Sequence, residues 1–130
     1  MSLPRLVRLP ALLLVAVLLS CHRPGAGGDG AQVEMKVIPQ PPVVGTAEIE
    51  IFLRDEKGNP LEATRVEIEG NMTHPGMTPT FWTAEPQGSG RWVGQLELTM
   101  GGDWLIEVDV VLDDGRRIHR TLPLPHVKPR

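Results

Sequence analysis

The chain contains 130 residues, with 13 lysine and arginine residues against 16 aspartate and glutamate residues and a formal net charge of −3. This length allows one domain. Because the basic residues form no run or stripe, the composition argues against nucleic acid as a partner. The chain has a single cysteine, which excludes an intrachain disulfide as a source of stability.

Residues 1–20 are predicted to be a bacterial lipoprotein signal peptide. Arg5 and Arg8 precede the apolar run 11–19, as in secretory signals. That run is too short to span a bilayer, which needs roughly 20 residues, so an uncleaved membrane anchor is the weaker alternative. The Leu-Leu-Ser sequence directly before Cys21 resembles a lipobox. We therefore expect cleavage before Cys21 and lipidation of its thiol by palmitate or similar acyl chains, which would hold the protein on a membrane.

The predicted signal also sets an expected location. The residue after Cys21 is His22 and not the aspartate that, by analogy, retains many lipoproteins at the inner membrane. We expect a protein of the bacterial cell envelope, lipid-anchored at the periplasmic face of the outer membrane. Residues 21–31 are rich in glycine and are predicted to form a flexible tether.

Residues 32–124 are predicted to form an all-β domain, an antiparallel immunoglobulin-like β-sandwich. Its clearest strand is 46–54, where every second residue is apolar, so that one face is buried and the other is solvated. About seven short strands separated by turn signals favour a sandwich; six of them are assigned, at 32–38, 46–54, 65–70, 92–98, 104–112 and 118–122. Residues 86–90 are predicted to be a turn. The chain after residue 122 is predicted to be a polar, proline-punctuated tail, with residues 125–130 outside the domain.

The stretch 71–82, NMTHPGMTPTFW, is the best candidate for a chemical site. Met72 and Met77 supply thioether sulfur and His74 supplies an imidazole, which are ligands suited to Cu(I). Pro-Gly at 75–76 would allow the loop to fold back so that these groups converge. Trp82 could lie over a bound cation, and His119 would join the site if its strand ends beside the loop.

A plainer interpretation of the same residues needs no metal. Met72 falls on the inward register of its strand and could simply fill the core. His74 would then be a turn residue, and Met77 would cover the end of the sandwich.

No constellation typical of an enzyme is found. Ser89 lies in a predicted turn with no histidine near it in the sequence, Cys21 is committed to lipid, and the charged residues are spread along outward strand faces. We therefore expect that the protein is not an enzyme.

Two stretches taken together resemble a known family. One is 71–77, with its two methionines, histidine and Pro-Gly-Met; the other is 90–110, GRWVGQLELTMGGDWLIEVDV. Over residues 32–124 the chain resembles the YtkA-like domain, which also covers the FixH-like proteins. The resemblance implies a small immunoglobulin-like β-sandwich outside the cytoplasmic membrane. The expected lipobox departs from the FixH-like pattern.

Some relatives in that family are linked to copper handling and cytochrome oxidase assembly. The resemblance therefore implies Met72, His74 and Met77 as copper ligands and a protein partner in the envelope or in respiratory oxidase assembly. Two hypotheses follow. The first is a lipid-anchored module that binds or delivers copper, as Cu(I), through the Met/His loop, the segment that carries Met72, His74 and Met77. The second is a metal-free structural or protein-interaction domain whose contact is an exposed Phe81 and Trp82 or a strand edge.

Overall fold

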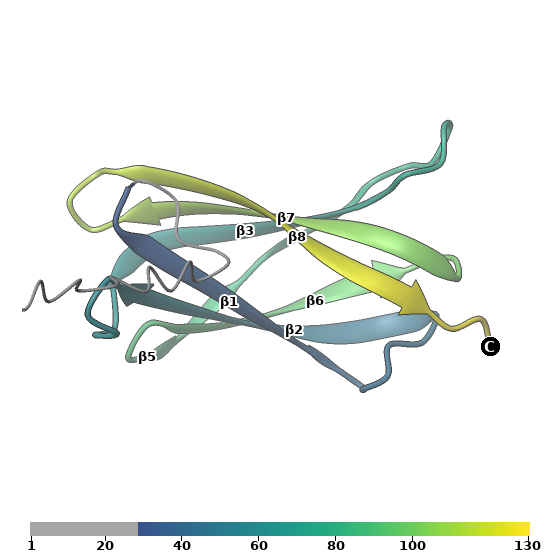
Figure 1. The fold of residues 1–130 in the computed structure, drawn as a ribbon, viewed down its shortest axis with the longest axis horizontal. Coiled ribbons are helices and arrows are strands. Elements are labelled where there is room, and N and C mark those ends of the chain that lie inside the picture. Colours follow the sequence, from purple (N-terminus) through teal and green to yellow (C-terminus); the bar gives the residue numbers. More distant parts are fainter. Residues whose placement is uncertain (1–28) are drawn as a thin grey trace, which may run out of the picture.

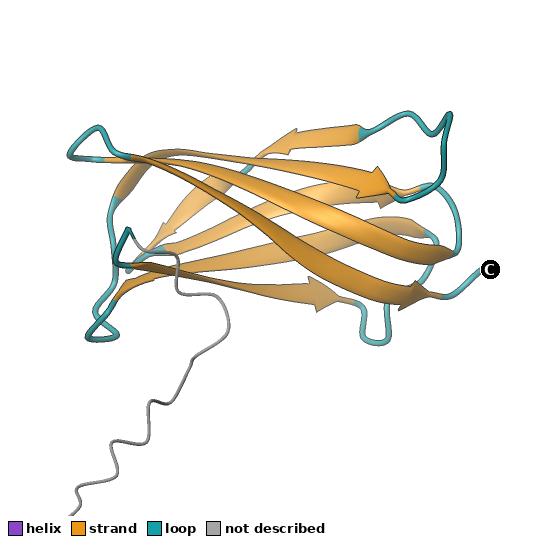
Figure 2. Ribbon diagram, turned by 45° about the horizontal axis from the view of Figure 1, so that its top comes forward, coloured by secondary structure: helices purple, strands orange, loops and turns teal. Residues whose placement is uncertain are grey.

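The computed structural model describes residues 29–130, so the predicted signal, Cys21 and most of the predicted tether lie outside the described residues. Two four-stranded antiparallel sheets pack face to face (Figures 1 and 2). One sheet has the strand order β1-β2-β6-β5 and the other β4-β3-β7-β8. The strands are β1 (Ala31–Ile38), β2 (Gly45–Asp55), β3 (Ala63–Met72), β4 (Thr80–Thr83), β5 (Glu85–Gly88), β6 (Arg91–Leu98), β7 (Gly102–Leu112) and β8 (Arg117–Val127).

This topology confirms the predicted immunoglobulin-like sandwich. The order β1-β2-β6-β5 corresponds to strands A, B, E and D of that fold, and β3-β7-β8 corresponds to C, F and G. The additional strand β4 lies beside β3 at a sheet edge, which brings the count to eight and not seven. The described part of the chain contains no helix, and therefore none long and apolar enough to cross a membrane.

The core lies between the two sheets and is built from the alternating inward positions. In β2, Ala47, Ile49, Ile51 and Leu53 are almost completely buried, as the alternation predicted. From the other sheet, Trp104 fills the largest single volume among the fully buried side chains. Each buried aliphatic or aromatic side chain contributes roughly 1.5–3 kcal/mol, so this layer supplies most of the driving force for folding.

The C-terminal segment differs from the sequence-based prediction. The last strand is predicted to end at residue 122, but β8 runs to Val127 and pairs with β7 from Arg117 to Leu124 and, after a register shift, again at Val127. Leu124 and Val127 are buried, so this part of the predicted tail belongs to the core. Proline is tolerated here because β8 is an edge strand, where one side of the backbone needs no ladder hydrogen bonds.

The segment between β3 and β6 also differs from its prediction. Residues 71–82 form the end of β3, a loop at 73–79 and the start of β4, and β5 occupies part of the predicted turn at 86–90. The buried Ala84 connects β4 in one sheet to β5 in the other. Its backbone N–H donates to the carbonyl oxygen of Val66 at 2.9 Å. The chain therefore crosses between the sheets at this residue.

The connecting loops gather at the two ends of the sandwich. We call one the tether end; it consists of Asp29 and Gly30, the turn at 55–61, Gly90 and the hairpin at 113–116 (Figure 1). The opposite end, the far end, consists of the loops 39–44, 73–79 and 99–101 together with residues 126–130. The loop 73–79 projects furthest from the body of the domain (Figure 1).

Candidate functional site

The candidate site begins with the loop 73–79 at the far end. The chain turns at Pro75 and Gly76, and Gly76 has a φ of +83°, a value that glycine adopts without strain. The chain therefore does turn at this dipeptide, as the residue types allow. His74 is exposed next to the turn, so its imidazole is open to solvent.

The two methionines of the loop have different environments. Met72 ends β3, opposite Trp104 of β7, and packs against the core cluster. Its methyl carbon lies 3.3 Å from the place that a Cβ on Gly102 would occupy. Met77 is half-buried and does not belong to the core cluster. Met72 is therefore held by the fold, as the metal-free interpretation expected, while Met77 covers no part of the core.

A third methionine, Met100, lies at the same end of the molecule. Its side chain is 48% exposed, and its backbone oxygen accepts a hydrogen bond from the indole Nε1 of Trp104 at 2.9 Å. Trp104 is the strand partner of Met72, so the turn that carries Met100 lies beside the base of the Met/His loop. Sequence reasoning missed this residue, because only the pairing of β3 with β7 brings the two segments together.

The structure does not bring Trp82 to the loop. Trp82 is opposite Ile68, which lies four residues before Met72 in β3, roughly 13 Å along the strand. Its indole Cδ1 would lie 2.8 Å from a Cβ on Gly94. The ring therefore lies against the backbone of β6, where only a glycine leaves enough room.

His119 is also separated from the loop. It is opposite Asp109, which is itself opposite Glu67 in the middle of β3, roughly 17 Å along the strand from Met72. The imidazole Nδ1 lies 2.7 Å from the Asp109 carboxylate, and Nε2 lies 3.8 Å from the Glu107 carboxylate. The hydrogen bond to Asp109 raises the pKa of His119 above its ordinary value, since it favours the protonated ring.

A polar network extends from His119 across the outer face of this sheet. The Asn71 side-chain amide donates to Glu107 at 2.8 Å and to Glu69 at 3.0 Å. Beside it, a groove of about 350 Å³ is lined by Arg65, Glu67, Asp109, Val110, Val111, Arg117, Ile118 and His119. Acidic and basic side chains share this groove, which is typical of a solvated sheet face.

Ligands of the zinc or calcium type do not converge in the described part of the chain. Among residues 29–130, no group of three histidine, cysteine, aspartate or glutamate side chains is arranged to hold a metal ion. A metal site at the far end would therefore depend on thioether sulfur from Met72, Met77 and Met100, with His74 as the nitrogen ligand. Such a donor set suits Cu(I) and not the harder divalent ions.

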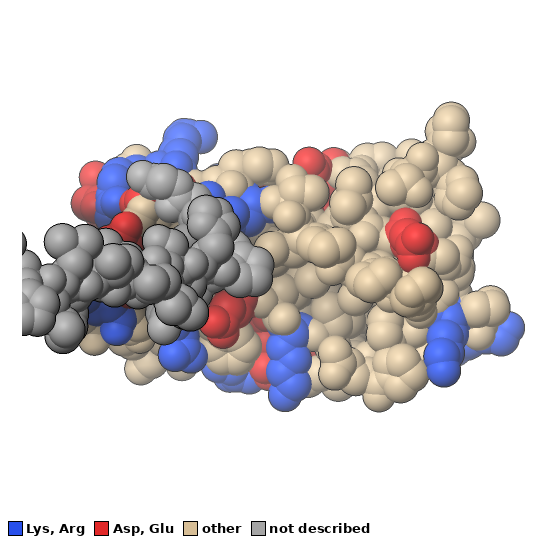
Figure 3. All heavy atoms as spheres, viewed as in Figure 1, with Lys and Arg blue, Asp and Glu red and all other residues tan. Residues whose placement is uncertain are grey.

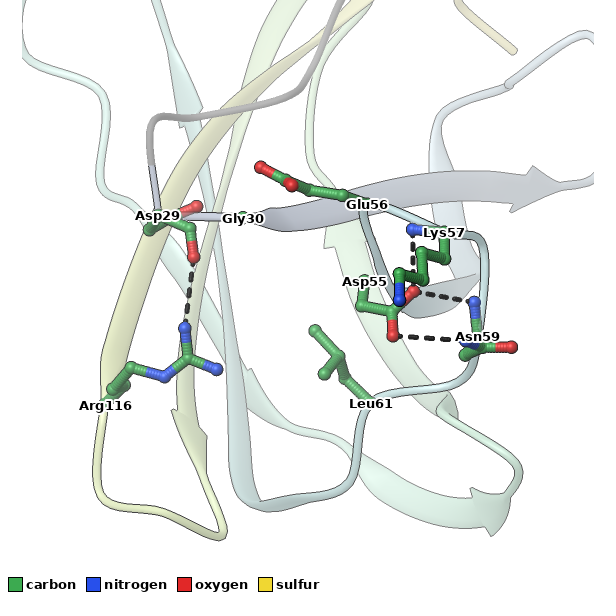
Figure 4. Close-up of a pocket in the computed structure, with 8 residues that line it drawn as sticks. All are labelled: Asp29, Gly30, Asp55, Glu56, Lys57, Asn59, Leu61 and Arg116. Atoms are coloured by element: carbon green, nitrogen blue, oxygen red, sulfur yellow. Dashed lines mark hydrogen bonds between the residues drawn. The ribbon is translucent and has the colours of Figure 1, made fainter.

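A pocket of about 540 Å³ lies at the tether end (Figure 4). The Asp55 carboxylate accepts hydrogen bonds from the backbone N–H groups of Lys57 and Asn59 and from the Asn59 amide, which lowers the pKa of Asp55. Arg116 donates to the backbone oxygen of Asp29 at 3.1 Å. These polar groups are engaged in shaping the turn and in fixing the start of β1, so they do not form a free set of ligands.

Comparison with known proteins places the chain in a family. Residues 26–109, more than half of the chain, match the model of the family described as YtkA-like. No curated protein and no solved structure matches the chain. The matched segment contains β1 to β6, most of β7 and the whole Met/His loop, whereas the kinship with FixH-like proteins stays a prediction. The chain belongs to the YtkA-like family.

Proposed function

We propose that this protein is a lipid-anchored module of the bacterial cell envelope that binds Cu(I) at its far end and passes it to a partner protein. One observation carries the proposal. Three methionines and a histidine lie at the far end of the sandwich: Met72 at the end of β3, His74 and Met77 in the loop 73–79, and Met100 in the neighbouring turn. Thioether and imidazole together are a ligand set for Cu(I).

The exposure of these side chains suits transfer as well as binding. Met72 is held against Gly102 and provides a fixed ligand, while His74 and Met100 are exposed and Met77 is half-buried. A metal held in this way would be accessible to an incoming partner, which could replace one ligand at a time. The long, flexible methionine side chain can follow such an exchange.

The position of the loop relative to the tether supports delivery away from the membrane. The lipid would be carried by Cys21, upstream of the tether end. β7 connects the two ends and has 11 residues, so it separates them by roughly 35 Å. The loop would therefore face a protein in the periplasm, with an outer-membrane anchor and a partner in respiratory oxidase assembly as the expected setting.

A Cu(I) titration of the full chain in a mild non-ionic detergent, against a competing chelator, tests this proposal. Tight binding of one ion should be lost in a Met72→Leu/Met77→Leu double variant and weakened at least about tenfold in Met100→Leu. Met35→Leu is the matched control, because Met35 is another half-buried methionine packed on the core but lies in β1. Wild-type protein that does not compete with the chelator would refute the copper proposal.

The second candidate function is a metal-free, non-catalytic interaction domain. The observation that favours it is Phe81, which is 66% exposed on the edge strand β4 although it is one of the largest apolar side chains of the domain. Methionines packed on the core would also fit this candidate, but among the three methionines at the far end only Met72 packs against the core. The two candidates use different surfaces and are separable by experiment.

A further inference from the structure

A second surface of interest lies where the chain crosses between the two sheets. β5 pairs with β6 only from Arg91 to Val93, so within residues 29–130 the other half of β6, residues 94–98, has no strand partner on that side. β4 is the edge strand of the other sheet. Between the two edges lies a groove of about 270 Å³, the edge groove, lined by Thr46, Thr80, Phe81, Trp82, Gln95, Leu96 and Glu97.

Aromatic side chains form one wall of the edge groove. Phe81 and Trp82 are 66% and 45% exposed, whereas the other two tryptophans of the domain are buried. The Trp82 ring packs against the backbone of β6 at Gly94, which fixes its position. Thr80 also lines the groove, and its buried hydroxyl has no hydrogen-bond partner in the described part of the chain.

Among the residues that line the edge groove, the one charged side chain is acidic, and two further glutamates lie on the flanking strands. Glu97 lies in the groove, Glu69 is the strand partner of Phe81, and Glu85 begins β5. None of the three forms an ion pair with another described residue. The segment 71–90 contains no lysine or arginine. Aromatic faces and carboxylates together attract a cation.

We propose that the edge groove binds an extended segment of a partner protein that carries lysine or arginine side chains. The segment would add as a strand to the free edge of β6 at residues 94–98, since unpaired N–H and C=O groups of a sheet edge accept such a strand. Its basic side chains would reach Glu97 and the Trp82 ring, and its apolar side chains would cover Phe81. A second copy of this chain is a poorer occupant, because two acidic edges repel one another.

The test uses the full chain in detergent and three short synthetic peptides. One alternates valine with lysine, one alternates valine with glutamate, and one keeps the lysines but replaces valines with proline, which cannot donate backbone hydrogen bonds. We expect the valine–lysine peptide to bind at least about tenfold more tightly than the other two. In NMR spectra, adding this peptide should change the backbone amide chemical shifts chiefly at residues 94–98.

Two variants and a matched control locate the binding. Glu97→Lys and Phe81→Ser should each weaken the valine–lysine peptide at least about tenfold, and both residues are exposed, so the fold should survive. Glu34→Lys is the control, because Glu34 is also exposed but lies on β1 at the opposite edge of the same sheet; it should leave binding unchanged.

Four outcomes would overturn the proposal. They are equal binding of the three peptides, no binding of any of them, shifts confined to another surface, and a wild-type dimer in sedimentation that Phe81→Ser dissociates. The last result would make a second copy the occupant. Glu97 and Phe81 are not among the proposed copper ligands. Failure of the peptide test would therefore leave the copper proposal standing, and failure of the copper titration would leave the edge-groove proposal standing.

Discussion

At the tether end charged side chains are paired with one another, whereas the far end exposes proline, methionine and histidine. Arg120 holds the Asp29 carboxylate through two hydrogen bonds of 2.6 and 3.0 Å, and Arg116 pairs with Asp114 at 2.7 Å. His74 forms no ion pair among residues 29–130. On the face shown in Figure 3, most of the charged residues lie towards the tether end, although some basic and acidic residues also lie at the far end.

The two ends of the domain therefore use their side chains differently. The tether end uses its polar groups to fix the start of β1 and the turns around it, so few are left for a ligand. The far end leaves His74 and Met100 exposed, while Met72 packs against the core that both ends share. The following predictions test whether the two ends differ in this way.

The largest expected effect is a difference between two glycines with similar backbone angles. Gly90 at the tether end has a φ of +73°, and a Cβ there would lie 2.4 Å from the Leu53 backbone oxygen; Gly76 at the far end has a φ of +83° with nothing within 4 Å. Gly90→Ala should lower the free energy of unfolding by about 3 kcal/mol. Gly76→Ala should lower it by about 1 kcal/mol, the cost of the backbone angle alone. Urea unfolding measures both, and equal losses would show that the ends are equally constrained.

A smaller effect is expected from the ion pair that closes the tether end. Arg120 is largely buried and bonds both the Asp29 carboxylate and the Ala31 backbone oxygen. Arg120→Ala should lower the free energy of unfolding by about 2 kcal/mol. Arg117→Ala is the control, because Arg117 is exposed and forms no ion pair within residues 29–130; it should change stability by less than about 0.5 kcal/mol.

The same pair predicts a pH dependence. The hydrogen bond from Arg120 lowers the pKa of Asp29 below its ordinary value of 3.8. A lowered carboxyl pKa stabilises the fold above the unfolded value, and that stability is lost as the pH falls through the folded value. Wild-type protein should therefore lose stability below about pH 4 more steeply than Arg120→Ala. Parallel curves would mean that the pair contributes nothing.

The smallest expected effect concerns His119, which lies between the two ends. Asp109 raises the pKa of His119, so its contribution to stability is fully present below about pH 6.5 and is lost as the pH rises through the folded value. NMR titration should give His119 a pKa above about 6.5, and Asp109→Asn should bring it down. Because the side chain is 54% exposed, the effect on stability should be small. A pKa unchanged by Asp109→Asn would contradict the hydrogen bond.

Much of the fold could be predicted because inward and outward residues alternate along the strands. The pattern of Ala47, Ile49, Ile51 and Leu53 identified β2 and its buried face, and the spacing of strands and turns indicated the sandwich. The errors lie where the local pattern is misleading. The prolines after residue 122 suggested a tail, yet Val127 is buried because β8 is long enough to cover the core at the far end.

The candidate site was predictable only in part, for a related reason. Met72, His74 and Met77 are close in sequence, so the loop could be recognised from residue types and from the Pro-Gly turn. Met100 could not be assigned to it, since its position depends on the pairing of β3 with β7. The distance of Trp82 and His119 from the loop depends on the same pairings.

The sequence by itself determined which residues face the core, where the chain turns and which loop carries soft ligands, because these properties depend on neighbouring residues. The tertiary structure decided which loops share an end, that the turn of Met100 lies beside Met72, and that one edge of β6 at residues 94–98 has no strand partner among the described residues. These features depend on the pairing of strands far apart in the chain. The packing of both sheets selects that pairing, and no local pattern specifies it.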